Sequence, residues 1–263
     1  INPAMAVTGA SAETLASGMT VAAQSFGFDL SDLKTAKLML DQMYAAGNLG
    51  NAELENLADI FARVGNNAKT AGLSFEGTLA FIERMSLVEK QPERLATLTD
   101  STLRLFTNQK YMTKAAKVTG VNFYDAKGER RAMFDVLADI RDRYQKFKTS
   151  AEKDKAFSAA FGDTDLDTQR GLRIFLDADT IDEARTFSGE IKESAGLIAQ
   201  KLPSAVANAV DQTARLKAEL GKAADAFAQP INDVIEDGIK YILDTQQIGG
   251  KELLVGGSLA ALG

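Results

Sequence analysis

The sequence contains no cysteine, no histidine and no tryptophan, and it has only 4 prolines. The absence of cysteine excludes disulfide bonds, thiol nucleophiles and cysteine metal sites. The absence of histidine excludes Ser-His-Asp and Cys-His catalysis, HExxH zinc sites and a histidine general base. Chemistry carried by carboxylates alone stays open.

An excess of basic residues is also missing. The chain has 36 acidic and 30 basic residues and a net charge of −6, so we expect no specific nucleic-acid site. No run of 18 apolar residues and no basic segment ahead of an apolar core occur, so we expect no complete transmembrane helix and no signal peptide. The 263 residues begin at Ile1 rather than Met. We expect a processed product or a portion of something longer, with one or two domains.

What the sequence does have is a helical pattern. Few prolines and frequent Ala, Leu, Lys and Glu favour helix, and apolar residues recur at three-four spacing. We therefore predict an all-α fold of helical hairpins that form a compact domain. The predicted helices cover residues 11–26, 29–47, 49–73, 74–85, 92–106, 133–144, 151–161 and 166–176.

Three of the predicted helix starts share a pattern, at residues 27–33, 47–54 and 72–76. In each, a glycine ends one helix, an apolar residue follows, and Ser, Asp or Asn caps the next helix with an acid in its first turn. Glycine supplies a left-handed C-cap, and the acid favours the helix N-terminus. The spacing between these starts is irregular, which argues against a strict solenoid repeat.

One central segment, residues 120–130, breaks the helical pattern. It alternates apolar and polar residues and then turns at Asp-Ala-Lys-Gly, residues 125–128. This pattern predicts one small β-hairpin, although two short strands alone are only marginally stable.

Beyond residue 180 the pattern changes. We predict one long helix over 181–202 and a second that starts with Pro203 at N1 and extends to about residue 243, kinked or split at Pro230. Apolar residues of the second helix are spaced alternately by three and four, which is typical of heptads. Two alternatives stay open for this face: packing within its own domain, or self-association as a coiled coil. The residues we expect to self-associate are Val206, Val210, Leu216, Leu220, Phe227 and Ile231.

The last residues, 249–263, are apolar and rich in glycine. They are either a disordered end or the first turns of a membrane-active segment, since small residues at close spacing suit helix packing in lipid. We therefore divide the chain into a compact helical core (1–179), long helices with a heptad pattern (180–248) and a Gly-rich apolar tail (249–263).

Two groups of acidic residues resemble metal ligands. Residues 125–128 look like half of a calcium loop but lack its remaining ligands, and a hairpin turn explains them. Asp163, Asp165 and Asp167 alternate along the chain, but an acidic helix N-terminus explains them more simply. We therefore expect no metal site and no cofactor.

Two further groups could carry chemistry. Glu53, Glu76 and Asp100 could serve as the paired carboxylates of a glycosidase, but nothing in the sequence brings two of them together. A basic spot at residues 127–131 could bind phosphate, but a solvated turn is its default interpretation. We therefore expect no catalytic residue.

Several segments carry a family resemblance, and the most specific is 116–128. It contains the motif residues Gly120, Val121, Asp125 and Gly128. Aliphatic and acidic residues follow at 133–140, and then an Ala-Ala-Phe-Gly step ends with Phe161 and Gly162. Upstream, the helix starts at 27–31 and 72–76 match a repeated alanine-glycine-aliphatic-serine pattern. Downstream, residues 220–231 form a segment with Gly221 and then Pro230.

In this order, the motifs resemble the core region of bacteriophage tail tape measure proteins, over roughly residues 8–243. Two departures occur. Thr119 stands where the family often has Leu, and the start at 47–54 has Asn where Ser is usual.

The resemblance implies a structural role and no enzymatic activity in this chain. Tape measure proteins lie as multimers in the tail lumen, set the tail's length while the tube polymerises around them, and leave ahead of the DNA. The implied partners are the chain itself (a trimer or other homo-oligomer), the tail tube protein, baseplate or tail-tip proteins, tail assembly chaperones and, during ejection, the host membrane. The implied locations are the virion tail lumen, the host cytoplasm during assembly and the host envelope on infection. Peptidase domains of some family members need histidine, which is absent here.

Two alternatives accompany this interpretation. A helical pore-forming or membrane-inserting bacterial secreted protein would use the Gly-rich tail as its insertion segment. A carboxylate-only enzyme, such as a lytic transglycosylase, would need two carboxylates facing each other across a pocket.

Overall fold

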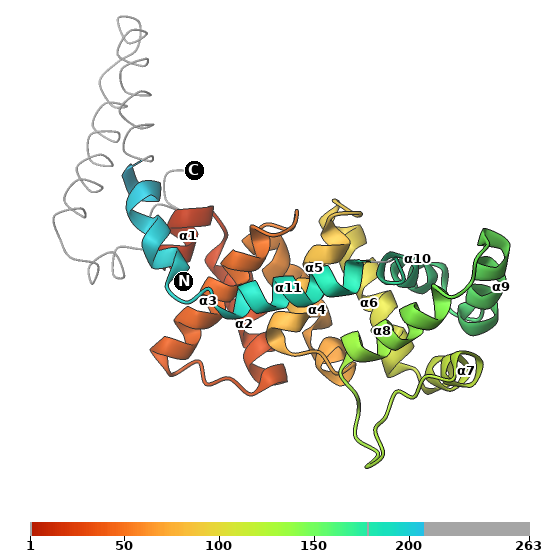
Figure 1. Cartoon of the computed structure of the whole chain (residues 1–263). Helices are drawn as coiled ribbons and strands as arrows, with labels where there is room; N and C mark the ends of the chain where they lie inside the picture. The colour runs from red at the N-terminus through yellow and green to blue at the C-terminus, as the bar shows by residue number, and fades with distance from the viewer. Residues whose placement is uncertain (1, 178, 208–263) are drawn as a thin grey trace, which may run out of the picture. The chain divides into compact units, whose positions relative to one another are not determined.

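The computed structural model describes residues 2–177 and 179–207, and these residues are helical (Figure 1), which confirms the predicted all-α class. A helical stretch over 197–207 follows the last labelled helix. The labelled helices are α1 (Asn2–Thr8), α2 (Ala12–Phe26), α3 (Leu33–Gly47), α4 (Leu54–Thr70), α5 (Phe75–Ser86), α6 (Pro92–Thr107), α7 (Gln109–Thr119), α8 (Met133–Tyr144), α9 (Ser150–Phe161), α10 (Leu166–Phe175) and α11 (Thr180–Lys192).

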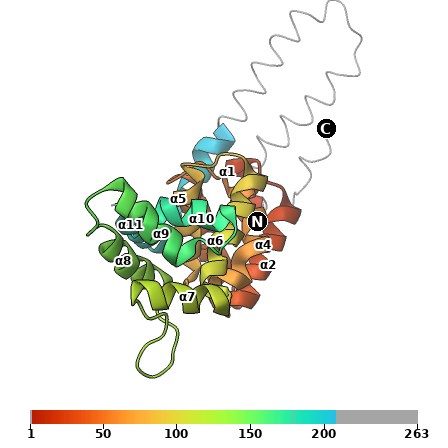
Figure 2. The same cartoon turned by 90° about the vertical axis from the view of Figure 1, so that its right-hand side faces the viewer.

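The chain divides into two compact units. The larger unit is Glu13–Ala195, and the other described residues, 2–12 and 196–207, belong to the second. In the larger unit α4 packs against α3, α5 and α6, α10 packs against α6, and α11 lies along α5 and α3. The pair α7 and α9 also packs together. The loop between α7 and α8 projects away from the helices in both views (Figure 1 and Figure 2).

Helix caps explain where several of these helices begin and end. Gly27 and Gly72 follow α2 and α4 with φ of 77° and 90°, the left-handed conformation that glycine adopts without strain. Asp32 accepts hydrogen bonds from the backbone N–H groups of Lys34 and Thr35, and Ser74 accepts one from that of Gly77. The glycine and the polar cap predicted at 27–33 and 72–76 are therefore confirmed. The acid predicted in the first turn is present in α5 as Glu76 but absent from the first turn of α3.

The third predicted start, at 47–54, is wrong in its details. Gly47 is the last residue of α3, Asn48 is the C-cap, and α4 begins after Glu53, whose side chain makes no capping hydrogen bond. Asn51 does not cap the helix. Its backbone N–H donates to Ser86 Oγ over 2.8 Å and its Nδ2 donates to the Ser86 carbonyl over 3.1 Å. A long-range contact with α5 has displaced the local cap.

The core of the larger unit is rich in phenylalanine. Phe61 and Phe75 pack edge-on with ring centroids 5.2 Å apart, and Phe26 contacts both rings. Phe81 and Phe175 stack with centroids 4.6 Å apart and planes 14° from parallel. The second pair joins α5 to α10, which is distant in sequence, and both pairs supply specific geometry in addition to buried apolar area.

The contact between α6 and α10 depends on a glycine. A Cβ built on Gly171 would collide with the side chain of Thr102 on α6. Nearby, Thr168 Oγ1 donates to the Ser101 carbonyl over 2.6 Å, which fixes the register of the two helices.

We therefore expect Gly171→Ala to lower the free energy of unfolding by about 1–3 kcal/mol, because the added methyl group forces the two helices apart. Urea unfolding would measure this loss. The matched control is Gly189→Ala in α11, where a Cβ would meet nothing within 4 Å and the better helix former should be neutral or stabilising. Equal effects of the two substitutions would contradict the close packing described here.

The small β-hairpin predicted at 120–130 is not confirmed. The described residues there form no strand, only one isolated antiparallel bridge between Tyr124 and Arg130. The Asp125 carboxylate accepts the backbone N–H groups of Lys127 and Glu129, both over 2.9 Å. Two backbone bonds accompany the bridge, from the Asp125 N–H to the Glu129 carbonyl and from the Arg131 N–H to the Phe123 carbonyl. The Asp125 side chain takes the Glu129 N–H that a longer ladder would use, so the pairing ends there and the segment is a tight loop.

The single long helix predicted over 181–202 is also wrong. It is interrupted after α11, where Ser194 Oγ bonds to the Ile191 carbonyl over 2.6 Å and Gly196 has φ of 82°. Pro203 is not at N1, because it lies inside the helical stretch 197–207. The coiled-coil character is not confirmed. Val206 lies in this stretch, and the other proposed self-association residues lie outside the described residues.

Candidate functional site

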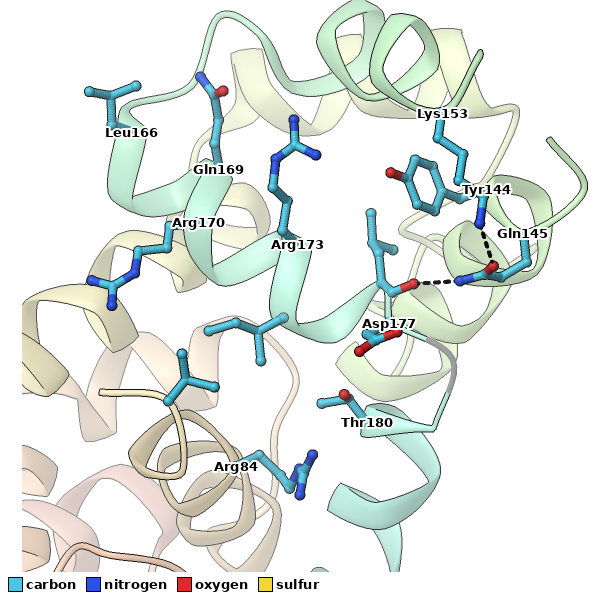
Figure 3. A pocket seen from close by; sticks show the side chains of 13 residues that line it. Arg84, Tyr144, Gln145, Lys153, Leu166, Gln169, Arg170, Arg173, Asp177 and Thr180 are labelled. Atoms are coloured by element: carbon cyan, nitrogen blue, oxygen red, sulfur yellow. Dashed lines mark hydrogen bonds between the residues drawn. The ribbon is translucent and has the colours of Figure 1, made fainter. Parts of the chain in front are cut away.

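An open hollow of about 780 Å³ lies in the larger unit, among α5, the end of α8, α9, α10 and the start of α11 (Figure 3). Four of its lining side chains are cationic, namely those of Arg84, Lys153, Arg170 and Arg173, and Asp177 is acidic. Its apolar lining includes Val88, Leu166, Ile174 and Leu176. We call this feature the cationic hollow.

Two capped helices position three of the four cations, and Arg84 lies on α5. Helix α10 begins after Asp165, whose side chain accepts from the Thr168 backbone N–H over 2.9 Å, and Arg170 and Arg173 follow one turn apart on one face. Lys153 lies in the first turn of α9, which starts with a reciprocal capping box of Thr149 and Glu152. In Figure 3, Arg173 lies on one side of the hollow and Lys153 on the other.

The arginines also contact groups of the protein itself. Arg170 Nη2 lies 3.1 Å from Glu89 Oε2. The pKa of Glu89 is lowered, first because its carboxylate accepts the Gln91 backbone N–H and second because of Arg170. Arg173 pairs with Asp154 over 3.2 Å and lies 4.0 Å from the centroid of the Phe157 ring.

The ion pair of Arg173 and the hydrogen bond of Lys153 compete only weakly with an incoming carboxylate. The side chains of Arg173 and Asp154 are 49% and 63% exposed, and exposed ion pairs contribute only about 0–1 kcal/mol. Lys153 donates to an uncharged acceptor, Gln145 Oε1, over 3.0 Å. The hollow can therefore accept further carboxylates while it offers aliphatic surface beside them, which is an arrangement for binding.

A second unusual group is Glu83 on α5, whose side chain is fully buried. Its Oε2 accepts from Ser86 Oγ over 2.8 Å and from the Ala52 backbone N–H over 3.3 Å, whereas its Oε1 has no hydrogen-bond partner. Burial raises the pKa of this carboxyl to about 8, because a buried carboxylate loses its hydration. Glu83 ties the loop before α4 to the end of α5.

The motif residues of the central loop form a helix cap, a buried contact and a turn. Gly120 is the left-handed C-cap of α7 with φ of 67°, and Val121 behind it is buried. Asp125 holds the loop through the two N–H groups described above, and Gly128 has φ of 83°. These contacts shape the loop.

Of the remaining motif residues, Phe161 and Gly162 lie in the part of the chain that the structure describes. Phe161 is buried and its ring centroid lies 5.1 Å from that of Phe157. Gly162 is the C-cap of α9 with φ of −62°, so it ends the helix without the left-handed conformation. Gly221 and Pro230 lie outside the described residues, and the roles proposed for all these residues stay predictions.

The aspartates at 163–167 take separate roles. Asp163 pairs with Lys114 over 2.6 Å, and this hydrogen-bonded cation lowers the pKa of Asp163. Asp165 caps α10. Across residues 2–177 and 179–207, no group of three His, Cys, Asp or Glu side chains could hold a metal ion.

The other two groups from the sequence are likewise divided among different contacts. Glu53 is the N-cap of α4, Glu76 accepts from Gln42 Nε2 over 3.2 Å, and Asp100 pairs with Arg104 over 3.0 Å. In the basic spot at 127–131, Arg130 donates to the Phe106 carbonyl and Arg131 pairs with Asp139. Both arginines therefore bind groups of the protein itself.

The sequence analysis singled out neither the residues of the cationic hollow nor Glu83. Arg170 and Arg173 share a helix face, but solvated arginines commonly do. The position of Glu83 could have been predicted from helical spacing. It follows Leu79 by four residues and precedes Ser86 by three, which places it on the apolar face of α5.

None of the described helices is long and apolar enough to cross a membrane. The Gly-rich tail at 249–263 lies outside those residues, so its membrane activity stays a prediction.

Comparison with known proteins gives two findings. The family model of the phage-related minor tail protein matches residues 4–162. A tape measure protein of Pneumococcus phage Dp-1 is 24% identical over 273 residues, which cover 98% of this chain and 22% of that protein. The chain thus spans about a fifth of that relative's length. No solved structure matches the chain.

Proposed function

The chain belongs to the phage-related minor tail protein family, and from this we propose that it is a portion of a tape measure protein that sets tail length and scaffolds tail tube assembly. The observation that carries the proposal is the similarity to a tape measure protein along 98% of the chain. We propose a structural rather than a catalytic role, followed by ejection ahead of the DNA.

The fold suggests how this portion contributes. An extended helix converts residue number into distance at about 1.5 Å per residue, which a compact unit cannot do. The larger unit, Glu13–Ala195, is compact, so we propose that it is a folded anchor for assembly rather than a linear spacer. Of the segment 180–248, α11 packs within the larger unit, so we propose that the elongated part begins after α11 and that 249–263 is a separate tail.

The proposed partners follow from this role. They are other copies of the chain, the tail tube protein, baseplate or tail-tip proteins and tail assembly chaperones, with the host membrane during ejection. The proposed locations are the tail lumen, the host cytoplasm during assembly and the host envelope on infection.

A deletion in the phage tests the anchor role. Removing residues 13–195 in frame should abolish tail assembly, because the surfaces that other tail proteins bind are lost. Electron microscopy of lysates would measure assembled tails, with a phage carrying Gly189→Ala as the control. Normal assembly of tails shortened in proportion, by about 270 Å at helical rise, would contradict an anchor and indicate a spacer.

A further inference from the structure

We propose that the cationic hollow docks residues 231–244 of a second copy of the chain. This inference rests on the proposed function, in which several copies lie together, and it names the surface and the segment that would join them.

The hollow combines positive charge with exposed aliphatic surface. Lys153 and Arg173 line it from α9 and α10. Leu166, at the first position of α10, is 82% exposed, and Val88, after α5, is 55% exposed. A partner that covers these two side chains removes apolar surface from water, which is favourable, while its carboxylates meet the cations.

The segment 231–244 has the complementary chemistry. It reads Ile-Asn-Asp-Val-Ile-Glu-Asp-Gly-Ile-Lys-Tyr-Ile-Leu-Asp, with four acidic residues, one lysine and six aliphatic residues. It lies outside the described residues, so the comparison rests on its composition. Opposite charges would fix the register and raise the association rate, and burial of aliphatic side chains would supply affinity.

The existing ion pairs of the hollow do not prevent docking. Asp154, Glu89 and Glu183 each pair with one arginine of the hollow, yet an arginine has five N–H donors and can bind more than one carboxylate. Lys153 donates to an amide oxygen, which an incoming carboxylate can replace with a charge-assisted bond. Each copy carries one hollow and one segment, so the contact between copies can be reciprocal.

Charge reversal in the full chain tests the proposal by sedimentation velocity over a series of concentrations. The wild-type chain should associate reversibly, and Arg173→Glu should raise the dissociation constant at least tenfold. Arg63→Glu is the matched control, because Arg63 is similarly exposed at 46% and pairs with Glu93 on another face. The double substitution Glu236→Arg and Asp237→Arg should weaken association as Arg173→Glu does, and combining all three should restore it.

Three results would overturn the proposal: a monomeric wild-type chain at every concentration, an effect of Arg173→Glu no larger than that of Arg63→Glu, or no recovery in the combined variant. Circular dichroism would show that each variant keeps its helices. A synthetic peptide of residues 231–244 should inhibit association, whereas the same peptide with arginine at 236 and 237 should not. The sedimentation result does not depend on the tail-assembly result. Failure of the docking contact is therefore distinguishable from failure of the proposed function.

Discussion

Glu83→Gln is expected to make the protein more stable than the wild type at pH 7.5, by on the order of 3 kcal/mol, and nearly equal to it at pH 4.5. The substitution keeps the shape of the side chain and an oxygen that can accept from Ser86 and Ala52. It removes the charge that the wild-type carboxyl would otherwise acquire in a buried position.

The sign follows from the pKa values in the two states. The carboxyl of Glu83 has a folded-state pKa of about 8 against an ordinary value of 4.5, so between these values the folded state holds a proton that the unfolded state has lost. The stability that this group contributes is therefore fully present below pH 4.5. It is lost as pH rises toward 8, at about 1.4 kcal/mol per pH unit.

Urea unfolding of both proteins at pH 4.5, 6 and 7.5 would measure the difference. Glu83→Ala is the companion variant, because it also removes the charge but leaves a cavity and an unpaired donor at the Ala52 backbone N–H. Ser86 Oγ keeps its bond to the backbone carbonyl of residue 83. This variant should therefore be less stable than Glu83→Gln at every pH. Parallel pH dependence of Glu83→Gln and the wild type would contradict a buried, protonated Glu83.

Phe175→Ala is expected to lower the free energy of unfolding by about 3–5 kcal/mol, the cost of a large cavity in a core. Phe175 is fully buried, stacks on Phe81 over 4.6 Å, and lies near Phe134 with centroids 6.4 Å apart. It therefore joins α10 to both α5 and α8, and no neighbouring side chain can fill its volume without moving.

Leu166→Ala is the matched control for this loss, because Leu166 lies on the same helix with 82% of its surface exposed. Its truncation should change stability by less than about 0.5 kcal/mol. Denaturant unfolding followed by far-ultraviolet circular dichroism would measure both. A small effect of Phe175→Ala, or an equal effect of the two, would contradict the packing of α10.

Local periodicity was sufficient to predict most of the helices. In α4 the residues Leu57, Ile60, Phe61 and Val64 are all fully buried, and their spacing alone identifies one helix face. Helix α7 was not predicted, for two reasons. Only Met112 and Ala115 are buried on it, and a single residue, Asn108, separates it from α6. Little apolar pattern marks such a helix.

The errors arose where a polar side chain overrode the backbone pattern. Asp125 turned an alternating segment into a loop, and Ser194 with Gly196 ended a helix that the apolar spacing continued. The cationic hollow was beyond prediction for another reason. Its side chains come from five different helices and their loops, and only long-range packing brings them together.

Tail length in assembled phage particles tests the proposed role as a tape measure most directly. The test needs in-frame deletions within residues 208–248, which leave the larger unit intact, and electron microscopy of the tails. We predict that removing four predicted heptads, about 28 residues, shortens the tail by about 40 Å, the length that they would span at helical rise. Normally assembled tails of unchanged length would contradict the claim that this segment measures the tail.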